Sequence, residues 1–252
     1  MAQSAKPTQL KPQTLGAFEA YIREAKAEMG QTLLGGGSFL WSDASSERAQ
    51  QILTGEIVAQ FWLGQGPVKV PNGLIHDWIG AAFLPATSLK KTLALIQDYD
   101  NHKYIYQPEV IDSKLISHHQ NDFRIYLRLL KRKIMTVVLD TDHKVHYRSL
   151  DPTRWTCRSY TTRIAEVENA GSPKEIVLPP DSGYGFLWRL DSYWRFQERD
   201  GGVCLECRAI SLTRDVPLGL GWIIQPIIQN LPKESLIKTL EDTRQALHAK
   251  AK

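Results

Sequence analysis

The sequence predicts an α+β protein in which a run of antiparallel strands is followed by a long C-terminal helix. An amphipathic helix is predicted after Pro85, because Leu89, Leu93 and Ile96 recur at helical spacing. Pro108 cannot continue a helix, and about a hundred residues after it alternate as strands do. A final apolar stripe at helical spacing consists of Leu236, Leu240, Thr243 and Leu247. These observations together predict a sheet packed on the last helix.

Composition favours one folded domain with an added arm. The 252 residues are 42% hydrophobic, which suffices for a full core. The 31 basic and 27 acidic side chains leave a net charge of +4, too balanced to indicate nucleic-acid binding. An uninterrupted apolar run of about 18 residues is absent from the sequence, so we expect no membrane span, although the sequence leaves open transient contact with a membrane surface.

Three regions are expected along the chain. Residues 1–13 are rich in Gln, Pro and Lys and are predicted to be a disordered lead. Residues 14–54 are predicted to be an N-terminal helical arm, with a helix from Thr14 to Met29, that packs on a main domain of residues 55–252. Because Ala2-Gln3-Ser4 follows the first Met, we expect an exported, periplasmic protein with its signal peptide removed; a cytoplasmic protein with a flexible N-terminus is the alternative.

Two strands are predicted before the first helix of the main domain, over residues 56–63 and 74–83. A turn at Pro71-Asn72-Gly73 introduces the second strand. His76 and Asp77 are neighbours in this strand, so their side chains point to opposite faces. We therefore expect His76 to be structural rather than a general base oriented by Asp77.

Four further strands are predicted over residues 111–117, 123–139, 143–150 and 154–166. The apolar positions change parity within the second of these, which predicts a β-bulge near residues 130–133. A turn is expected next, at Asp140-Thr141-Asp142. The basic run Lys131-Arg132-Lys133 is then interpreted as a solvated strand edge guarded by charge, in preference to a phosphate or nucleic-acid site.

Neither a metal site nor a redox motif is expected, and no cofactor is predicted. The adjacent pair His118-His119 cannot both face one ion, and no Cys, Asp or Glu stands at ligand spacing from this pair, His143 or His146. Cys204 and Cys207 have the spacing of a redox motif but lie in an alternating strand pattern instead of at a helix N-terminus. A strand points them to opposite faces, so we expect two free thiols.

The hairpin formed by residues 186–197 and 203–213 is the most informative part of the sequence. A two-residue turn at Asp200-Gly201 fixes the pairing of its strands. It pairs Trp188 with Thr213, Leu190 with Ser211, Ser192 with Ala209, Trp194 with Cys207 and Phe196 with Leu205. Large aromatic residues opposite small ones leave room over this face, either for a close helix or for a ligand. The other face pairs Arg195 with Glu206 and Tyr193 with Arg208, so we expect it to be solvated.

An aspartate-aromatic-aromatic-proline segment, made by Asp98, Tyr99, Tyr106 and Pro108, stands between the first helix of the main domain and the strand run. This segment, the strands and the last helix together resemble the START-like, or helix-grip, superfamily, which includes polyketide cyclases, pollen allergen proteins and lipid-transfer domains. The resemblance spans residues 55–247. It implies a curved antiparallel sheet wrapped around a gripping helix, expected from Pro232 to Ala249, with a cavity between them.

The leading functional hypothesis is binding of an apolar or amphipathic small molecule, lipid-like, quinone-like or aromatic, in this cavity. The residues predicted to contact the ligand are Trp188, Leu190, Ser192, Trp194, Phe196, Ala209, Ser211, Trp222 and Tyr126. The alternative is an enzyme that resembles polyketide cyclases or aromatases and steers an enolate. Its candidate residues are His76, Arg128, Tyr126 and Tyr160. A third class is a ligand-free interaction module.

Overall fold

The computed structural model describes residues 7–64, 66–132, 136–215 and 221–249. Ten of its strands form one antiparallel sheet: β2 (Val58–Phe61), β3 (Val68–Val70), β4 (Gly73–Pro85), β5 (Val110–His119), β6 (Asp122–Arg132), β7 (Thr136–Ser149), β8 (Arg154–Glu168), β9 (Ile176–Val177), β11 (Arg189–Arg199) and β12 (Gly202–Arg214). Two short strands, β1 (Thr8–Gln9) and β10 (Ser182–Gly183), form a separate pair. The helices are α1 (Pro12–Leu34), η1 (Ser42–Ala44), α2 (Ser46–Leu53), α3 (Leu89–Ile96), η2 (Tyr99–Asn101), α4 (His102–Ile105) and α5 (Gly221–Ala249).

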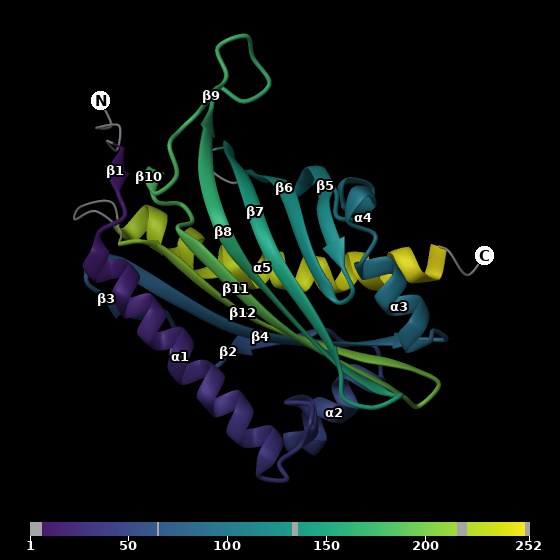
Figure 1. Ribbon diagram of the computed structural model, residues 1–252. Coiled ribbons are helices and arrows are strands. Elements are labelled where there is room, and N and C mark those ends of the chain that lie inside the picture. Colours follow the sequence, from purple (N-terminus) through teal and green to yellow (C-terminus); the bar gives the residue numbers. More distant parts are fainter. Residues whose placement is uncertain (1–6, 65, 133–135, 216–220, 250–252) are drawn as a thin grey trace.

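The strands of the sheet follow the order β2-β4-β12-β11-β8-β7-β6-β5, with β3 added to β4 and β9 to β8. The sheet curves around α5, which runs along its hollow side (Figure 1). The predicted α+β class, with a curved antiparallel sheet around a C-terminal helix, is therefore confirmed.

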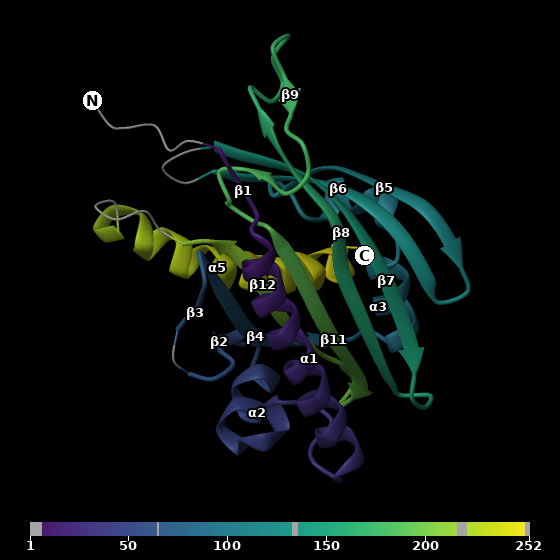
Figure 2. The same cartoon turned by 60° about the vertical axis from the view of Figure 1, so that its left-hand side comes forward.

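Alternate residues of each strand divide between an inner face toward α5 and an outer face toward α1. On β4, Trp78 belongs to the inner face and lies in the same core cluster as Leu240 of α5. Ile75 belongs to the outer face and lies in a second cluster with Phe18 and Ile22 of α1. Figure 2 shows α1 and α5 on opposite sides of the sheet.

The β6–β7 hairpin replaces the single bulged strand that was predicted over residues 123–139. Arg132 pairs with Thr136 and Leu129 with Leu139, so the change of parity comes from a chain reversal. Asp140-Thr141-Asp142, predicted as a turn, lies inside β7. The sequence between the two strands has no Gly, Pro, Asn or Asp to signal the reversal, which explains the error.

Lys131 is not part of a solvated strand edge. Its ammonium group donates to the hydroxyl of Ser235 on α5 at 2.6 Å and forms an ion pair with Glu109. The solvated interpretation of Lys131 is therefore wrong, because the end of β6 lies against α5 and the segment before β5.

The β11–β12 hairpin has the predicted register. Phe196 pairs with Leu205 and Ser192 with Ala209, and Asp200 and Gly201 have φ values of 54° and 75°. Such positive φ values are those of a two-residue type I′ turn. The neighbouring thiols are free as predicted, with Cys207 in the inner core cluster and Cys204 in an outer one, while the third thiol, Cys157, is also free.

The N-terminal arm covers the outer face. α1 extends beyond the predicted Thr14–Met29 helix at both ends. A third apolar cluster joins the arm to the sheet and consists of Phe39, Leu40, Ile52, Ala81, Phe83 and Cys204. Part of the predicted disordered lead is structured, because β1 pairs with β10 and the Leu10 amide donates to the Asp181 carbonyl at 2.8 Å.

The arm also buries charged residues that were expected on a solvated face. Arg208 and Glu206 are 3% and 1% exposed. Arg208 donates to both carboxylate oxygens of Asp77, with Nη2–Oδ2 at 2.7 Å and Nε–Oδ1 at 3.0 Å. Glu206 accepts the amide hydrogens of Trp41 and Ser42 at 2.8 and 2.7 Å. The prediction of a solvated face is wrong because α1 and the segment after it pack over this part of the sheet.

Helix α5 begins at Gly221 and not at the predicted Pro232, so Pro226 and Pro232 both lie within it. Proline lacks the amide hydrogen that an interior helical position donates, which is why a helix start was predicted there. Three residues of the predicted stripe are buried as expected, with Leu236 at 5% and Leu240 and Thr243 at 0% exposure, while Leu247 is half-buried.

Candidate ligand site between the sheet and helix α5

Gly80 on β4 lets α5 approach one side of the sheet closely. A Cβ atom at Gly80 would lie 2.9 Å from Leu236 Cδ2 and 3.1 Å from Leu240 Cδ1. Such distances are too short for a real Cβ atom, so a glycine permits this packing. Helix α5 consequently lies nearest to β4 and its neighbours β2 and β12, at one side of the curved sheet.

The inner face beyond β12 is only partly covered. Phe196 is 0% exposed, whereas the next inner-face residue on β11, Trp194, is half-buried. The uncharged half-buried inner-face residues on β6, β8, β11 and β12 are Leu127, Leu129, Trp155, Ser159, Leu190, Ser192, Trp194 and Ala209. Because a close-packed core excludes solvent from such side chains, this part of the inner face is open to solvent. The curved antiparallel sheet around α5 has the helix-grip arrangement that was expected from the sequence.

Several of the predicted contact residues share this open surface of the helix-grip sheet. Leu190, Ser192, Trp194 and Ala209 lie on it together. Ser211 is on the same face but only 7% exposed, and Phe196 is part of the closed core. Contact between these side chains and a ligand stays a prediction.

Three other predicted contact residues are not placed on the inner face. Trp188 precedes β11, which begins at Arg189, and it packs in the outer-face cluster with α1, so its predicted face is wrong. The alternation that placed it there does not extend beyond the strand. Tyr126 lies on the outer face, where its hydroxyl donates to Asp140 Oδ1 at 2.7 Å. The side chain of Trp222, in the first turn of α5, lies outside the described residues.

The residues suggested for an enolate-steering enzyme are not gathered at one site. His76 is on the inner face, but Arg128 and Tyr160 are on the outer face. Arg128 forms a two-pronged ion pair with Asp140, at 2.7 and 2.9 Å, and the guanidinium of Arg158 lies 4.4 Å from the Tyr160 ring centre. This set is therefore wrong as a catalytic group, because the strand parity separates its members.

His76 is buried at the end of the inner face nearest β3. Its Nε2 lies 3.0 Å from the hydroxyl of Thr213, and its Nδ1 has no hydrogen-bond partner among the described residues. Burial lowers the pKa of His76 to about 4, so the ring is neutral at pH 7.

A polar strip crosses the open inner face and was not predicted. It consists of Thr141, His143, Ser159 and Ser192, on three neighbouring strands. His143 Nε2 lies 2.9 Å from Thr141 Oγ1, and His143 Nδ1 lies 3.5 Å from Ser159 Oγ. Ser192 stands directly across from Ser159 and accepts the indole N–H of Trp194 at 3.1 Å. The strip was missed because Thr141 was assigned to a turn; alternation carried back from Val145 would have found it.

The hydrogen bonds fix the tautomer of His143. The Thr141 hydroxyl donates to the Leu127 carbonyl at 2.9 Å, so its oxygen must accept the Nε2 hydrogen of His143. This leaves Nδ1 as an unprotonated acceptor that faces Ser159. Burial, with a smaller contribution from His102, lowers the pKa of His143 to about 4, so the strip is uncharged at pH 7.

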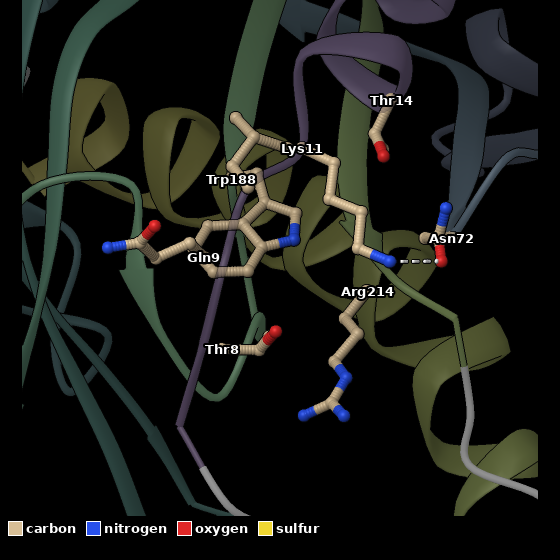
Figure 3. Close-up of a pocket in the computed structure, with 8 residues that line it drawn as sticks. Thr8, Gln9, Lys11, Thr14, Asn72, Trp188 and Arg214 are labelled. Carbon is tan, nitrogen blue, oxygen red and sulfur yellow. Dashed lines mark hydrogen bonds between the residues drawn. The ribbon is translucent and has the colours of Figure 1, made fainter.

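Two surface pockets formed by described residues lie away from the inner face. The first, of about 120 Å³, is at the start of α1 and is lined by Thr8, Gln9, Leu10, Lys11, Thr14, Asn72, Trp188 and Arg214 (Figure 3). In it the Lys11 ammonium donates to Asn72 Oδ1 at 3.0 Å. The second, of about 380 Å³, lies between α2 and the end of α5 and is lined by Leu53, Thr54, Gly55, Phe83, Pro85, Arg244 and His248.

The described ranges contain no group of three or more His, Cys, Asp or Glu side chains that could hold a metal ion. No helix there combines the length and apolar character needed to cross a membrane.

Comparison with solved structures finds proteins of similar shape. A STAR-related lipid transfer protein fragment from Xanthomonas axonopodis is 15% identical with a TM-score of 0.48, covering 72% of this chain and 97% of that one. The Zhui aromatase/cyclase from Streptomyces sp. R1128 is 11% identical with a TM-score of 0.46, covering 71% and 96%. Human STARD10 is 8% identical with a TM-score of 0.44, covering 82% and 81%. No protein-family model and no curated protein matches the sequence. Likenesses this distant carry no information about the ligand or reaction of this chain.

Proposed function

We propose that this chain binds an apolar or amphipathic small molecule between α5 and the open inner face of the sheet. The observation that carries the proposal is the partial exposure of Trp194, Trp155 and Leu190 on a face that a helix already covers at one side. Burial of apolar surface stabilises a complex by about 25 cal/mol per Å², so a ligand that covers these side chains gains affinity from each. The neutral hydroxyls beside them suit an amphipathic molecule with a small polar group.

Ligand binding is tested on protein stripped of bound lipid. A polarity-sensitive dye is titrated while tryptophan emission is followed, and fatty alcohols, fatty acids, sterols, quinones and aromatic polyketides are then added as competitors. We expect at least one class to displace the dye and to raise the melting temperature, because a ligand that binds only the folded state stabilises it. No change in emission or melting temperature with any class would contradict the proposal and favour a ligand-free interaction module.

A substitution that fills the site separates an open cavity from a closed core. Ala209 is half-buried on the inner face and stands between Trp78 and Ser192 on the neighbouring strands. Ala209→Trp should abolish dye binding with little loss of stability if space is present. In a filled core the same change would cost about 1–3 kcal/mol, because overpacking strains its surroundings. Lys144→Trp, at an exposed outer-face position of β7, is the control and should leave dye binding unchanged.

A cyclase-like enzyme that uses the same cavity is the second candidate. The observation that favours it is a neutral imidazole, His143, whose unprotonated Nδ1 is on the inner face. Such a nitrogen can accept a proton from a carbon between two carbonyl groups. Incubation with a linear poly-β-ketone, followed by mass spectrometry of the aromatic products, checks this candidate. The cyclase candidate requires that the protein turns over the poly-β-ketone and that His143→Gln abolishes turnover but retains dye binding. If the compound binds and is not turned over, the cyclase candidate is wrong and only the binding function remains.

A further inference from the structure

We propose that the ligand carries an uncharged hydroxyl group, which binds between Ser159 and Ser192 on the polar strip, and carries no formal charge inside the cavity. This inference rests on the proposed function and specifies the chemistry of its ligand.

The two serines are placed to contact one ligand atom. Ser159 on β8 and Ser192 on β11 are direct partners across the antiparallel pair, and both belong to the inner face. The Cβ atoms of such partners lie about 4.5–5.5 Å apart, so one oxygen atom can reach both hydroxyls. Both serines are half-buried among apolar neighbours, including Trp194.

The donors and acceptors around the serines match a hydroxyl. Ser192 Oγ accepts the Trp194 indole N–H, which leaves the Ser192 hydrogen available to a ligand oxygen. The Ser159 hydrogen faces the bare Nδ1 of His143, which leaves the Ser159 oxygen as an acceptor. The pair thus offers one donor and one acceptor. A ligand hydroxyl satisfies both, whereas an ether, ketone or carboxylate oxygen can only accept.

The charged side chains at inner-face positions of the described strands already have partners. Lys131 pairs with Glu109, and Glu166 accepts the amide hydrogens of residues 184–186. The remaining pairs join Glu168 to the Tyr184 hydroxyl, Glu198 to the Leu89 amide, and Lys69 to Asp215. A carboxylate or sulfate in the cavity would therefore lie beside neutral groups, and an unpaired buried charge is strongly disfavoured.

Helix α5 adds no charge over its first turns. Residues 216–232 contain no Asp, Glu, Lys, Arg or His. The first charged residue after them, Lys233, has its ammonium group 5.7 Å from the centre of the Trp78 ring, on the β4 side of the inner face. Lys233 is therefore the cation to test if an anionic ligand binds.

Two matched ligand series test the inference on full-length protein stripped of lipid. One compares 1-hexadecanol, its methyl ether and hexadecanoate; the other compares cholesterol, its methyl ether and its sulfate. In whichever series displaces the dye, we expect the alcohol to bind about tenfold tighter than the ether, the effect of one neutral hydrogen bond. The anion should bind weaker than the alcohol by about a hundredfold or more at pH 7.5.

Variants of the strip show whether the serines cause this preference. Ser159→Ala removes the acceptor that only a ligand hydroxyl can use, so it should reduce the alcohol-to-ether ratio to about one and leave the affinity for the ether unchanged. Ser192→Ala removes the donor that both oxygens can use, so it should weaken the alcohol and the ether by a similar factor and keep the ratio. Thr156→Ala removes a hydroxyl from the outer face of the same strand, β8, and should keep the ratio.

The contrary outcomes distinguish a failure of the hydroxyl inference from a failure of the proposed binding function. Equal affinity for alcohol and ether, or tighter binding of the anion that Lys233→Gln abolishes, would overturn the inference while the binding function stands. Failure of every compound in both series would overturn the binding function, and the inference with it.

Discussion

The two faces of the sheet bury polar groups in different ways. On the outer face, beneath the N-terminal arm, the buried charged groups Asp77, Glu206 and Arg208 are paired within the chain. Arg208 binds Asp77, and Glu206 accepts amide hydrogens from the segment after α1. On the inner face the buried part of the polar strip is neutral, and its Ser159 and Ser192 hydroxyls remain partly exposed.

This contrast between paired charges and half-exposed hydroxyls indicates which polar groups are needed for folding. A buried charge costs several kcal/mol unless a fixed partner compensates it, so the outer face is stable only with the arm in place. A half-exposed hydroxyl costs little when it is left to water, so the inner face can keep such groups for a ligand. The outer polar groups therefore hold the arm on the sheet, whereas the inner hydroxyls are not needed to hold any element in place, as the proposed ligand site requires.

The largest expected effect is on the outer face. Arg208→Leu leaves Asp77, which is 4% exposed, without its guanidinium partner, and should lower the free energy of unfolding by about 3–5 kcal/mol. Urea denaturation followed by tryptophan fluorescence measures the change. Arg163→Leu is the control, because its 3.6 Å pair with Asp142 is about one-third exposed and should contribute under about 1 kcal/mol. Similar losses in the two variants would contradict the contrast between the faces.

A somewhat smaller effect is expected where α5 meets the inner face. Leu240 is 0% exposed and packs against Gly80, so Leu240→Ala should cost about 2–5 kcal/mol through lost burial and a new cavity. Ile176→Ala, at a 53% exposed position of β9, should change the free energy of unfolding by less than about 0.5 kcal/mol. A loss under about 1 kcal/mol for Leu240→Ala in the same urea experiment would mean that α5 does not close this side of the sheet.

The pH dependence of stability tests whether the polar strip is neutral. His143 has a folded pKa of about 4, below its usual 6.5, so the unfolded state takes up a proton between these values and the folded state does not. Its stabilising contribution is full above pH 6.5 and falls by about 1.4 kcal/mol per unit as the pH drops toward 4. His143→Gln should remove this part of the slope, which amounts to about 2 kcal/mol between pH 6.5 and 5. Urea melts at several pH values measure it. Equal slopes for both proteins over that range would show that His143 is not buried as a neutral ring.

The sequence predicted those parts of the fold in which turn chemistry and strand alternation agree. Asp200-Gly201 supplied both the turn and the register of β11 and β12, so Leu190, Ser192, Trp194 and Ala209 were placed on one face correctly. Between β6 and β7 the alternation changes without a turn residue, and the hairpin was mistaken for a bulged strand. The polar strip was missed with it, because Thr141, which lies inside β7, was assigned to a turn.

Coverage of the outer face could not be predicted from local pattern. An arginine opposite a glutamate, as in Arg195 and Glu206, is a cross-strand pair typical of a solvent-exposed sheet face. Only contacts with residues far away in the sequence show that Glu206 is buried. The residue that donates its amide to Glu206, Trp41, is 165 positions away, and Asp77 is 131 positions from Arg208. Trp188 was misplaced for a related reason: its packing is decided by α1 and not by the strand that follows it.

The smallest expected change in the free energy of unfolding is that of Ser159→Ala on the inner face. This variant tests most directly whether the inner-face hydroxyls are dispensable for folding. Ser159 is half-buried, and its hydroxyl makes one long contact of 3.5 Å, so Ser159→Ala should change the free energy of unfolding by less than about 0.5 kcal/mol. Thr141 is 0% exposed and joins the Leu127 carbonyl to His143, so Thr141→Val should cost about 1–3 kcal/mol by leaving both partners unsatisfied. Urea melts at pH 7.5 without ligand measure both. A cost for Ser159→Ala close to that of Thr141→Val would mean that the fold needs this hydroxyl, and that it is not held available for a ligand.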